Sequence, residues 1–413
     1  MAGGRWAIWG TLIGTITLSA GCVGSPWTSS ATTTSDATVR PVAFEETTDD
    51  QSSEPSSDAA DGAKSPLREM VAQVTGNVAD PQAARAAYAE AEAIYAEAVR
   101  LRAAGDRAAA EPRFLQAAEQ FRKAAQAWPD SAVEEDAWLR AGESAFFGNR
   151  FVDANEAYEQ LLAKHPDSRY QDFIQARQLA IARYWLNSNR ADPLAWYEVN
   201  LFDPTGPLYD WKGNALRLLK KIPLDNPTGK YADDAILAHA NTLFLDGKYD
   251  QADQLYDDLR TLYPTSQHQF TAHLMGIKTK MLRYQGPEYG GDVLDQAEKL
   301  IQRVRIQFPQ EAAANRELLD RAAREIRYRK AERDWFMARY YDRRGEYRAA
   351  AFYYKGLQED YDDTPFATRA KDRIGAIADK PPVPPQRLAW LVKLFPDRQP
   401  ARPILKTEST LRR

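Results

Sequence analysis

The sequence predicts an all-α fold, a TPR α-solenoid of five to six helix pairs that follows a disordered N-terminal tether. An alanine recurs six times, large apolar residues flank it at helical spacing, and in five copies a proline follows twelve residues later. The six alanines are Ala117, Ala154, Ala215, Ala252, Ala297 and Ala350. A generic helical bundle gives no reason for one pattern in six copies, so we expect stacked repeats, of the tetratricopeptide (TPR) kind.

Each alanine lies within the second helix of a pair. The residues four positions later are Phe121, Tyr158, Leu219, Tyr256, Ile301 and Tyr354. Steps of three and four put these residues on one helical face. Proline cannot continue a helix, because it lacks the N–H, so we expect the helices to end before Pro129, Pro166, Pro227, Pro264 and Pro309. Asp362 takes that place in the last copy. In the third copy Lys212 breaks the pattern of apolar residues, and we expect Trp211 to take the aromatic role.

Glycines mark the turn between the two helices of a pair. Gly148, Gly247 and Gly345 each follow an apolar helical segment, as C-terminal capping glycines do. Helices are predicted to begin near Pro81, with the first turn at Gly105. The alanine intervals are 37, 61, 37, 45 and 53 residues, so two lie near the TPR length of roughly 34 and the others carry insertions.

The N-terminus predicts export. Arg5 precedes an apolar run from Trp6 to Leu18, and the only cysteine, Cys22, follows small residues. This pattern indicates a lipoprotein signal peptide over residues 1–22, with an acylated Cys22 as the mature N-terminus and a membrane anchor. Ser19 stands where a large aliphatic residue is usual. An ordinary secretory signal cut nearby and an uncleaved anchor are the alternatives.

Composition divides the rest of the chain. Residues 23–80 are rich in Ser, Thr and acidic residues, which predicts a disordered tether. The solenoid is expected over 81–379, and residues 188–210 interrupt its third repeat, more as a packing cover than as a functional loop. Residues 380–413 form a Pro-rich tail in which a short amphipathic segment either docks on the last repeat, which we favour, or meets a partner. Its apolar residues are Leu388, Trp390, Leu391, Leu394 and Phe395.

The sequence carries no signature of catalysis. A net charge of −4 and a pI near 5.8 leave no basic footprint, so nucleic acid is not an expected partner. The four histidines lack the spacing of helical metal ligands, and the Gly-rich residues 286–291 lack the Lys-Ser/Thr ending of a phosphate loop. We therefore predict no enzyme, no metal and no cofactor. Residues 311–342 are predicted to form one charged helix. We favour a solvated face with i,i+4 ion pairs over an arginine-bearing docking face.

The repeats resemble those of the BamD/YfiO family of outer-membrane lipoproteins. Pro-Asp-Ser or Pro-Thr-Ser ends follow Trp128, His165 and Tyr263, and residues 338–350 are similar to that family's last repeat. The resemblance covers about residues 83–377. It implies a lipid-anchored protein at the periplasmic face of the cell outer membrane. Its implied partners are a barrel-forming outer-membrane assembly subunit and unfolded outer-membrane proteins.

The resemblance also suggests where partners bind. The C-terminal repeats would dock on the barrel-forming subunit, with candidate residues Arg343, Arg344, Tyr341, Arg327 and Arg324. We take Arg343 and Arg344 to lie in a turn. The N-terminal repeats would receive unfolded substrate, with candidate groove residues Phe146, Phe147 and Leu139. Leu139 and Glu143 stand where chaperone-binding TPRs place Lys and Asn, so a carboxylate clamp is not expected. The rival function is a periplasmic lipoprotein that coordinates envelope division or peptidoglycan synthesis.

Overall fold

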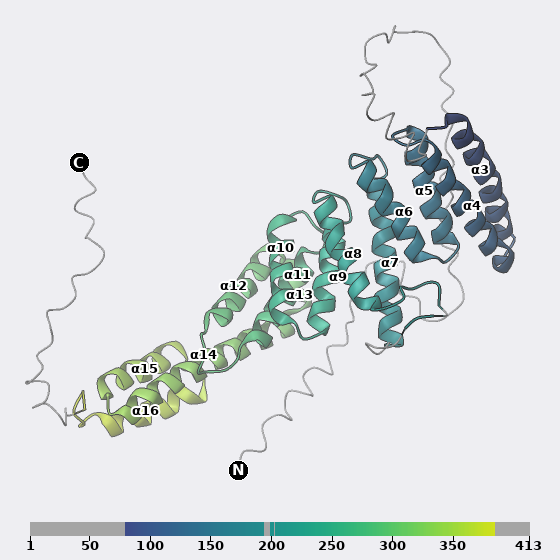
Figure 1. The fold of residues 1–413 in the computed structure, drawn as a ribbon. Helices are drawn as coiled ribbons and strands as arrows, with labels where there is room; N and C mark the ends of the chain where they lie inside the picture. Colours follow the sequence, from purple (N-terminus) through teal and green to yellow (C-terminus); the bar gives the residue numbers. More distant parts are fainter. Residues whose placement is uncertain (1–78, 194–198, 202, 385–413) are drawn as a thin grey trace, which may run out of the picture. The chain divides into compact units, whose positions relative to one another are not determined.

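The computed structural model describes residues 79–193, 199–201 and 203–384. The predictions for the signal peptide, for Cys22, for nearly all of the tether and for the tail from residue 385 lie outside this part. The described residues form fourteen α-helices and contain no β-strand, so the predicted all-α repeat fold is confirmed. Figure 1 shows these helices in chain order, labelled α3 to α16.

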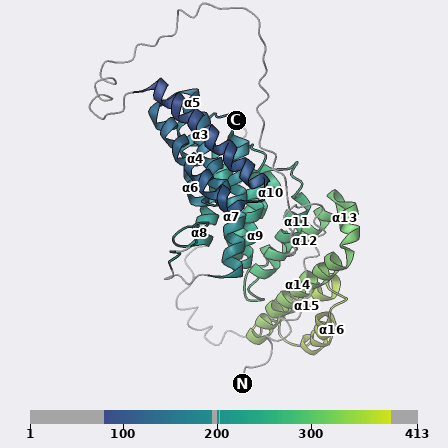
Figure 2. The ribbon, with the colours of Figure 1, turned by 90° about the vertical axis from the view of Figure 1, so that its right-hand side faces the viewer.

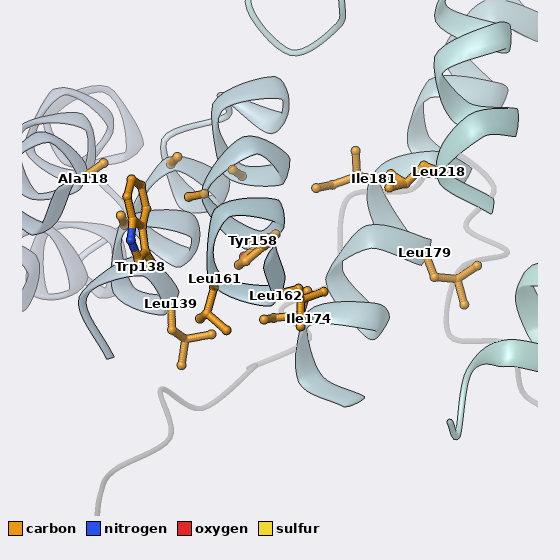
Figure 3. Close-up of a cluster of buried hydrophobic side chains, with 14 of the residues drawn as sticks. Ala118, Trp138, Leu139, Tyr158, Leu161, Leu162, Ile174, Leu179, Ile181 and Leu218 are labelled. Carbon is orange, nitrogen blue, oxygen red and sulfur yellow. The ribbon is translucent and has the colours of Figure 1, made fainter. Parts of the chain in front are cut away.

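In each of the first three pairs, the two helices pack on each other. Helix α3 (Pro81–Ala103) packs on α4 (Arg107–Ala127), α5 (Ala132–Phe147) on α6 (Phe151–Lys164), and α7 (Gln171–Ala191) on α8 (Trp211–Asp225). Each pair also contacts the next helix along the chain. Figure 3 shows buried side chains of α4 to α8, which include Trp138, Tyr158 and Ile174 in one hydrophobic cluster.

The remaining pairs follow the same order. Helix α9 (Ala232–Leu245) packs on α10 (Tyr249–Leu262), and α11 (Gln269–Arg283) on α12 (Asp292–Gln307). After the short α13 (Pro309–Ala314) comes the long α14 (Arg316–Arg344), which packs on α15 (Tyr347–Asp360). Helix α15 in turn packs on α16 (Pro365–Ile377), beside the C-terminal part of α14 (Figure 2).

The alanine register is confirmed in every copy. All six alanines have no exposed surface, and the large residues four positions later are at most 2% exposed. They lie on α4, α6, α8, α10, α12 and α15. The absence of a large side chain at the alanine lets the neighbouring helix approach closely, while the larger residues fill the space beside it. In the third copy Trp211 is buried, as the sequence suggested. Lys212 pairs with Asp246.

The turns and helix ends also match the sequence. Each of the six second helices ends two residues before the expected stop residue. Gly247 and Gly345 have positive φ values of 74° and 76°, a backbone region that glycine enters without steric cost. Each therefore reverses the chain within a pair. Pro309 differs slightly from expectation, because it stops α12 and also begins α13.

In two of the three Pro-Asp-Ser or Pro-Thr-Ser ends, the serine links one repeat to the repeat before it. Ser168 Oγ donates to Glu135 Oε1 at 2.6 Å, and Ser266 Oγ donates to Asp233 Oδ2 at 2.5 Å. Both links join residues 33 positions apart. These two ends thus join neighbouring repeats in addition to stopping helices, whereas Ser131 of the first end donates to the Trp128 carbonyl and caps α5.

Two predicted boundaries are wrong. Residues 311–342 do not form one helix, because α13 stops at Ala314 and α14 starts after Asn315. Buried Ala312 joins Leu319 in a hydrophobic cluster, and this packing turns the chain between the two helices. The insertion begins at Asp192 rather than 188, since α7 continues to Ala191. Its Thr205 carbonyl accepts from Trp185 Nε1 at 2.9 Å, a contact that fits the packing cover we favoured.

Candidate functional site

A cavity of about 350 Å³ opens among α14, α15 and α16. Its lining combines aromatic and cationic side chains with one carboxylate: Trp335, Arg339, Asp342, Arg343, Tyr347, Tyr354 and Arg373. Trp335, Arg339 and Arg343 are spaced four apart, which places them in a row on one face of α14. Tyr347 and Tyr354 are seven apart on α15 and line the same cavity.

The carboxylate of Asp342 is held by its neighbours. It accepts hydrogen bonds from Arg373 Nε at 2.6 Å, from Arg373 Nη2 at 2.9 Å and from the Tyr354 hydroxyl at 3.1 Å. The bond from Arg373 holds the pKa of the Asp342 carboxyl below its usual value. Burial, together with the charge of Asp342, raises the pKa of Tyr354 to about 12. Arg373 and Asp342 therefore neutralise each other within the wall of the cavity.

Arg339 and Arg343 leave the cavity with a surplus of positive charge. Both are exposed, and neither has an ion-pair or hydrogen-bond partner within the part of the chain that the structure describes. Their guanidinium groups present planar sets of N–H donors, which match carboxylate geometry. The aromatic walls and the two unpaired cations suit an acidic group carried on an apolar or aromatic scaffold.

Three of the five predicted docking residues lie together at the end of α14. Arg343, Arg344 and Tyr341 lie close to one another, but the two arginines belong to the last turn of α14 and not to an inter-helix turn. The expectation of a turn was wrong because Gly345, the capping residue, follows both arginines and α14 includes them. Arg344 donates to the Tyr340 hydroxyl at 2.6 Å and pairs with Glu346 at 2.9 Å.

The other two predicted docking residues lie far along α14. Arg327 precedes Arg343 by 16 residues, about 24 Å of helix. It pairs with Asp363 at 2.7 Å and with Asp362 at 3.4 Å, so its charge holds α14 to the loop between α15 and α16. Arg324 is exposed. Some arginines of α14 thus link this helix to another part of the chain, and others form ion pairs within α14. Neither the solvated face nor the docking face that the sequence suggested includes such a link between helices.

The predicted substrate residues lie on α5, and one of them is buried. Leu139 is 8% exposed within the hydrophobic core, which leaves little of its side chain for a ligand. Phe146 and Phe147 are half-buried neighbours with ring centroids 5.8 Å apart. Phe151 extends the row at 5.3 Å from Phe146, and Tyr184 follows at 4.9 Å from Phe151. This row of rings, Phe147–Phe146–Phe151–Tyr184, is called the aromatic row below.

Arg177 packs against the aromatic row, and the sequence did not single it out. Its guanidinium lies 4.5 Å from the Phe146 ring centroid, a cation–π arrangement, and bonds Glu143 at 2.7 and 2.8 Å. Glu143 also accepts from the Tyr158 hydroxyl at 2.6 Å. Arg177 and Glu143 are 34 positions apart, so one repeat length separates the two members of this buried pair. That spacing was the signal that could have predicted the pair.

The described residues show neither a metal centre nor a membrane span. Within 79–193, 199–201 and 203–384, no group of His, Asp and Glu residues could hold a metal ion. Over the same ranges no helix is both long and apolar enough to cross a bilayer.

A comparison with known protein families gives two matches. Residues 210–374 match the YfiO family, whose description is outer membrane lipoprotein. We call residues 210–374 the YfiO segment after this match. Residues 136–168 match the tetratricopeptide repeat, in agreement with the helix pair α5–α6. The cavity of α14 to α16 lies almost entirely inside the YfiO segment, whereas the aromatic row precedes it.

Other comparisons add little to the YfiO match. No curated protein matches the chain. A solved structure of the C-terminal part of a TPR repeat-containing protein from Cytophaga hutchinsonii is similar at 12% identity and a TM-score of 0.30. The match covers 70% of this chain and 99% of that one. With so low a TM-score, the assignment of the fold rests on the helix pairs themselves.

Proposed function

We propose that this protein is a periplasmic scaffold, anchored in the outer membrane through an acylated Cys22, that assists the assembly and insertion of β-barrel outer-membrane proteins. It acts by binding and not by catalysis. The last helix pairs hold the barrel-forming subunit, and the N-terminal pairs receive unfolded substrate. The YfiO match over residues 210–374 supports the compartment, and stacked helix pairs offer surfaces for extended or helical peptides.

The cavity of α14 to α16 carries this proposal. Arg339 and Arg343 are exposed cations without partners among the described residues, and they stand beside Trp335 and Tyr347. Arginine and aromatic residues are enriched at protein interfaces. An acidic side chain of the barrel-forming subunit would bond the two guanidinium groups, while apolar neighbours of that side chain pack on the rings.

The aromatic row supports the second half of the proposal. Strands of outer-membrane barrels alternate apolar and polar residues and carry aromatic girdles. An unfolded barrel protein therefore exposes aromatic side chains that can pack on Phe146, Phe151 and Tyr184. Tyr184 is 40% exposed, which leaves a ring face for such a contact.

Charge reversal at the end of α14 tests the docking face. In the Arg343→Glu/Arg344→Glu double variant, we expect recovery of the barrel-forming subunit in pull-downs to fall at least about tenfold, because one desolvated charge contact contributes 2 kcal/mol or more. The melting temperature should stay close to that of the wild type, since exposed ion pairs contribute little to folding.

Arg316→Glu/Arg321→Glu is the matched control. It makes the same charge change at two exposed arginines near the start of the same helix, and recovery should be unchanged. If both double variants recover the barrel-forming subunit equally well, the cavity is not part of the interface. A wild-type protein that recovers no barrel-forming subunit, but recovers division or peptidoglycan-synthesis proteins, would contradict the assembly role itself and favour the rival function.

A further inference from the structure

The outer face of α15 differs from the same face of the other five second helices. Two positions after the repeat alanine, the other copies have Glu119, Glu156, Arg217, Gln254 and Lys299. Six positions after it, they have Lys123, Gln160, Lys221, Asp258 and Arg303. The last copy has Phe352 and Gly356 at these two positions. At both positions the other five copies carry polar side chains. The last copy carries a large ring at the first position and no side chain at the second.

Phe352 continues into a contiguous set of rings. Its side chain is 74% exposed, and its ring lies 5.6 Å from Tyr353. Tyr353 stacks on Tyr341 at 5.6 Å, and Tyr341 contacts Tyr340 at 5.3 Å. A Cβ added at Gly356 would meet nothing within 4 Å. We call Phe352, Gly356 and these three tyrosines the α15 strip; it offers a protruding ring beside a flat segment of backbone.

The chain returns to this strip after α16. The backbone N–H of Arg348 donates to the carbonyl of Pro382 at 3.0 Å. Lys380 Nζ lies 4.9 Å from the Tyr347 ring centroid. Arg348 is one helical turn before Phe352 and on the same face. Helical side chains lean toward the N-terminus, so the Phe352 ring leans toward the point where Pro382 is held.

The sequence that follows has the composition and length to cover the strip. Pro384 is the last described residue, and four residues later begins an apolar set with spacings of three and four: Leu388, Leu391, Leu394 and Phe395, with Trp390 beside them. Pro384 lies beside the turn before α15, where a Cβ added at Gly345 would be 3.6 Å from its Cβ. Four residues span at most about 14 Å, whereas Phe352 lies seven residues, about 10 Å of helix, beyond Gly345. Eight residues of helix would be about 12 Å long, which matches the strip from Phe352 past Gly356.

We propose that residues 388–395 dock on the α15 strip of their own chain. A short linker keeps this segment at millimolar effective concentration, so even a weak apolar contact is occupied. Arg348 and Lys355 flank the strip and Lys393 lies in the segment, so the attraction comes from apolar burial and not from charge. An acidic partner protein would instead be held by the flanking cations and released by salt. This contact does not depend on the partner that the last pair holds.

Hydrogen–deuterium exchange of the full-length protein in detergent tests the contact. Peptides over residues 388–395 should be protected in the wild type and should exchange about tenfold faster or more in Phe352→Gln, because the variant removes a buried aromatic contact. Glutamine is the residue that the fourth repeat has at this position, so the fold should tolerate it. Protection in the wild type should persist at high salt.

Ile306→Gln is the matched control, since Ile306 is 79% exposed on α12. It should leave exchange over residues 388–395 unchanged. Unprotected amides in the wild type, or the same loss of protection with both variants, would overturn the proposal. Protection that grows with protein concentration would also overturn it, because a second copy would then cover the strip. Fast exchange that slows only with an added partner, and only at low salt, would assign the strip to that partner.

Discussion

Several buried charges lie between the fourth and fifth helix pairs. The side chain of Lys280 is 3% exposed, and its Nζ donates to Asp253 Oδ2 at 2.8 Å. Burial lowers the pKa of Lys280, and the hydrogen bond that Lys280 donates to Asp253 opposes that shift. Burial also lowers the pKa of Arg260 to about 10. Such groups stabilise the helix contact only while each retains its partner, since an unpaired buried charge is costly.

His273 in the same region predicts a pH dependence of stability. Its Nδ1 bonds the Gln269 carbonyl at 2.8 Å, and burial, aided by Arg260 and Arg303, lowers its pKa. A group with a lowered folded pKa contributes its full stability above its unfolded pKa, near 6.5, and loses it as the pH falls through the folded value. The free energy of unfolding should therefore decrease from pH 7.5 to pH 5.5, and by less in His273→Gln.

Urea unfolding at several pH values measures this difference. Glutamine can still donate to the Gln269 carbonyl but does not titrate. His239→Gln serves as a second variant, since burial, with Lys220, also lowers the pKa of His239, and the two effects should add. Identical pH profiles for the wild type and His273→Gln would show that this histidine does not contribute to the dependence.

At the scale of the element, two helical glycines should respond oppositely to alanine. In α5, a Cβ at Gly142 would clash with Cε1 of Tyr158, a fully buried ring whose hydroxyl is bonded to Glu143. In α16, a Cβ at Gly375 would meet nothing within 4 Å. Gly142→Ala should destabilise by about 1–3 kcal/mol through overpacking. Gly375→Ala should stabilise by about 0.5–1 kcal/mol, because alanine is the better helix former. Urea midpoints of the two variants give the comparison, and a stable Gly142→Ala would mean that the α5–α6 contact is looser than described.

The elements that the sequence predicted well are those with local causes. The buried alanines, the glycine turns and the proline stops each depend on residues within one helix pair. The break at Asn315 has no such local signal, since its neighbours are ordinary helix formers and the turn follows from the packing of Ala312. Of the five docking residues that the sequence suggested, only Arg343 lines the cavity. Arg343 stands out in the sequence, whereas Arg373 joins it only through Asp342, 31 positions away.

At the scale of the whole molecule, the membrane anchor remains a prediction from sequence alone. If Cys22 is the acylated N-terminus, mass spectrometry of the first peptide from isolated membranes should show a lipid-modified cysteine. Cys22→Ser should leave the protein unprocessed or release it from the membrane, because the thiol carries the acyl group. An unmodified N-terminus at another residue would exclude this anchor. Secretion without a lipid would favour the ordinary signal peptide.

The one-repeat separation of the polar links has a consequence for how the chain folds. Ser168–Glu135, Arg177–Glu143 and Ser266–Asp233 each join residues only 33 or 34 positions apart. Low sequence separation between contacting residues gives fast folding, because little loop entropy is lost before a contact forms. A growing chain can therefore complete each inter-repeat contact about one repeat length after its first partner has emerged, long before its C-terminus has been synthesised.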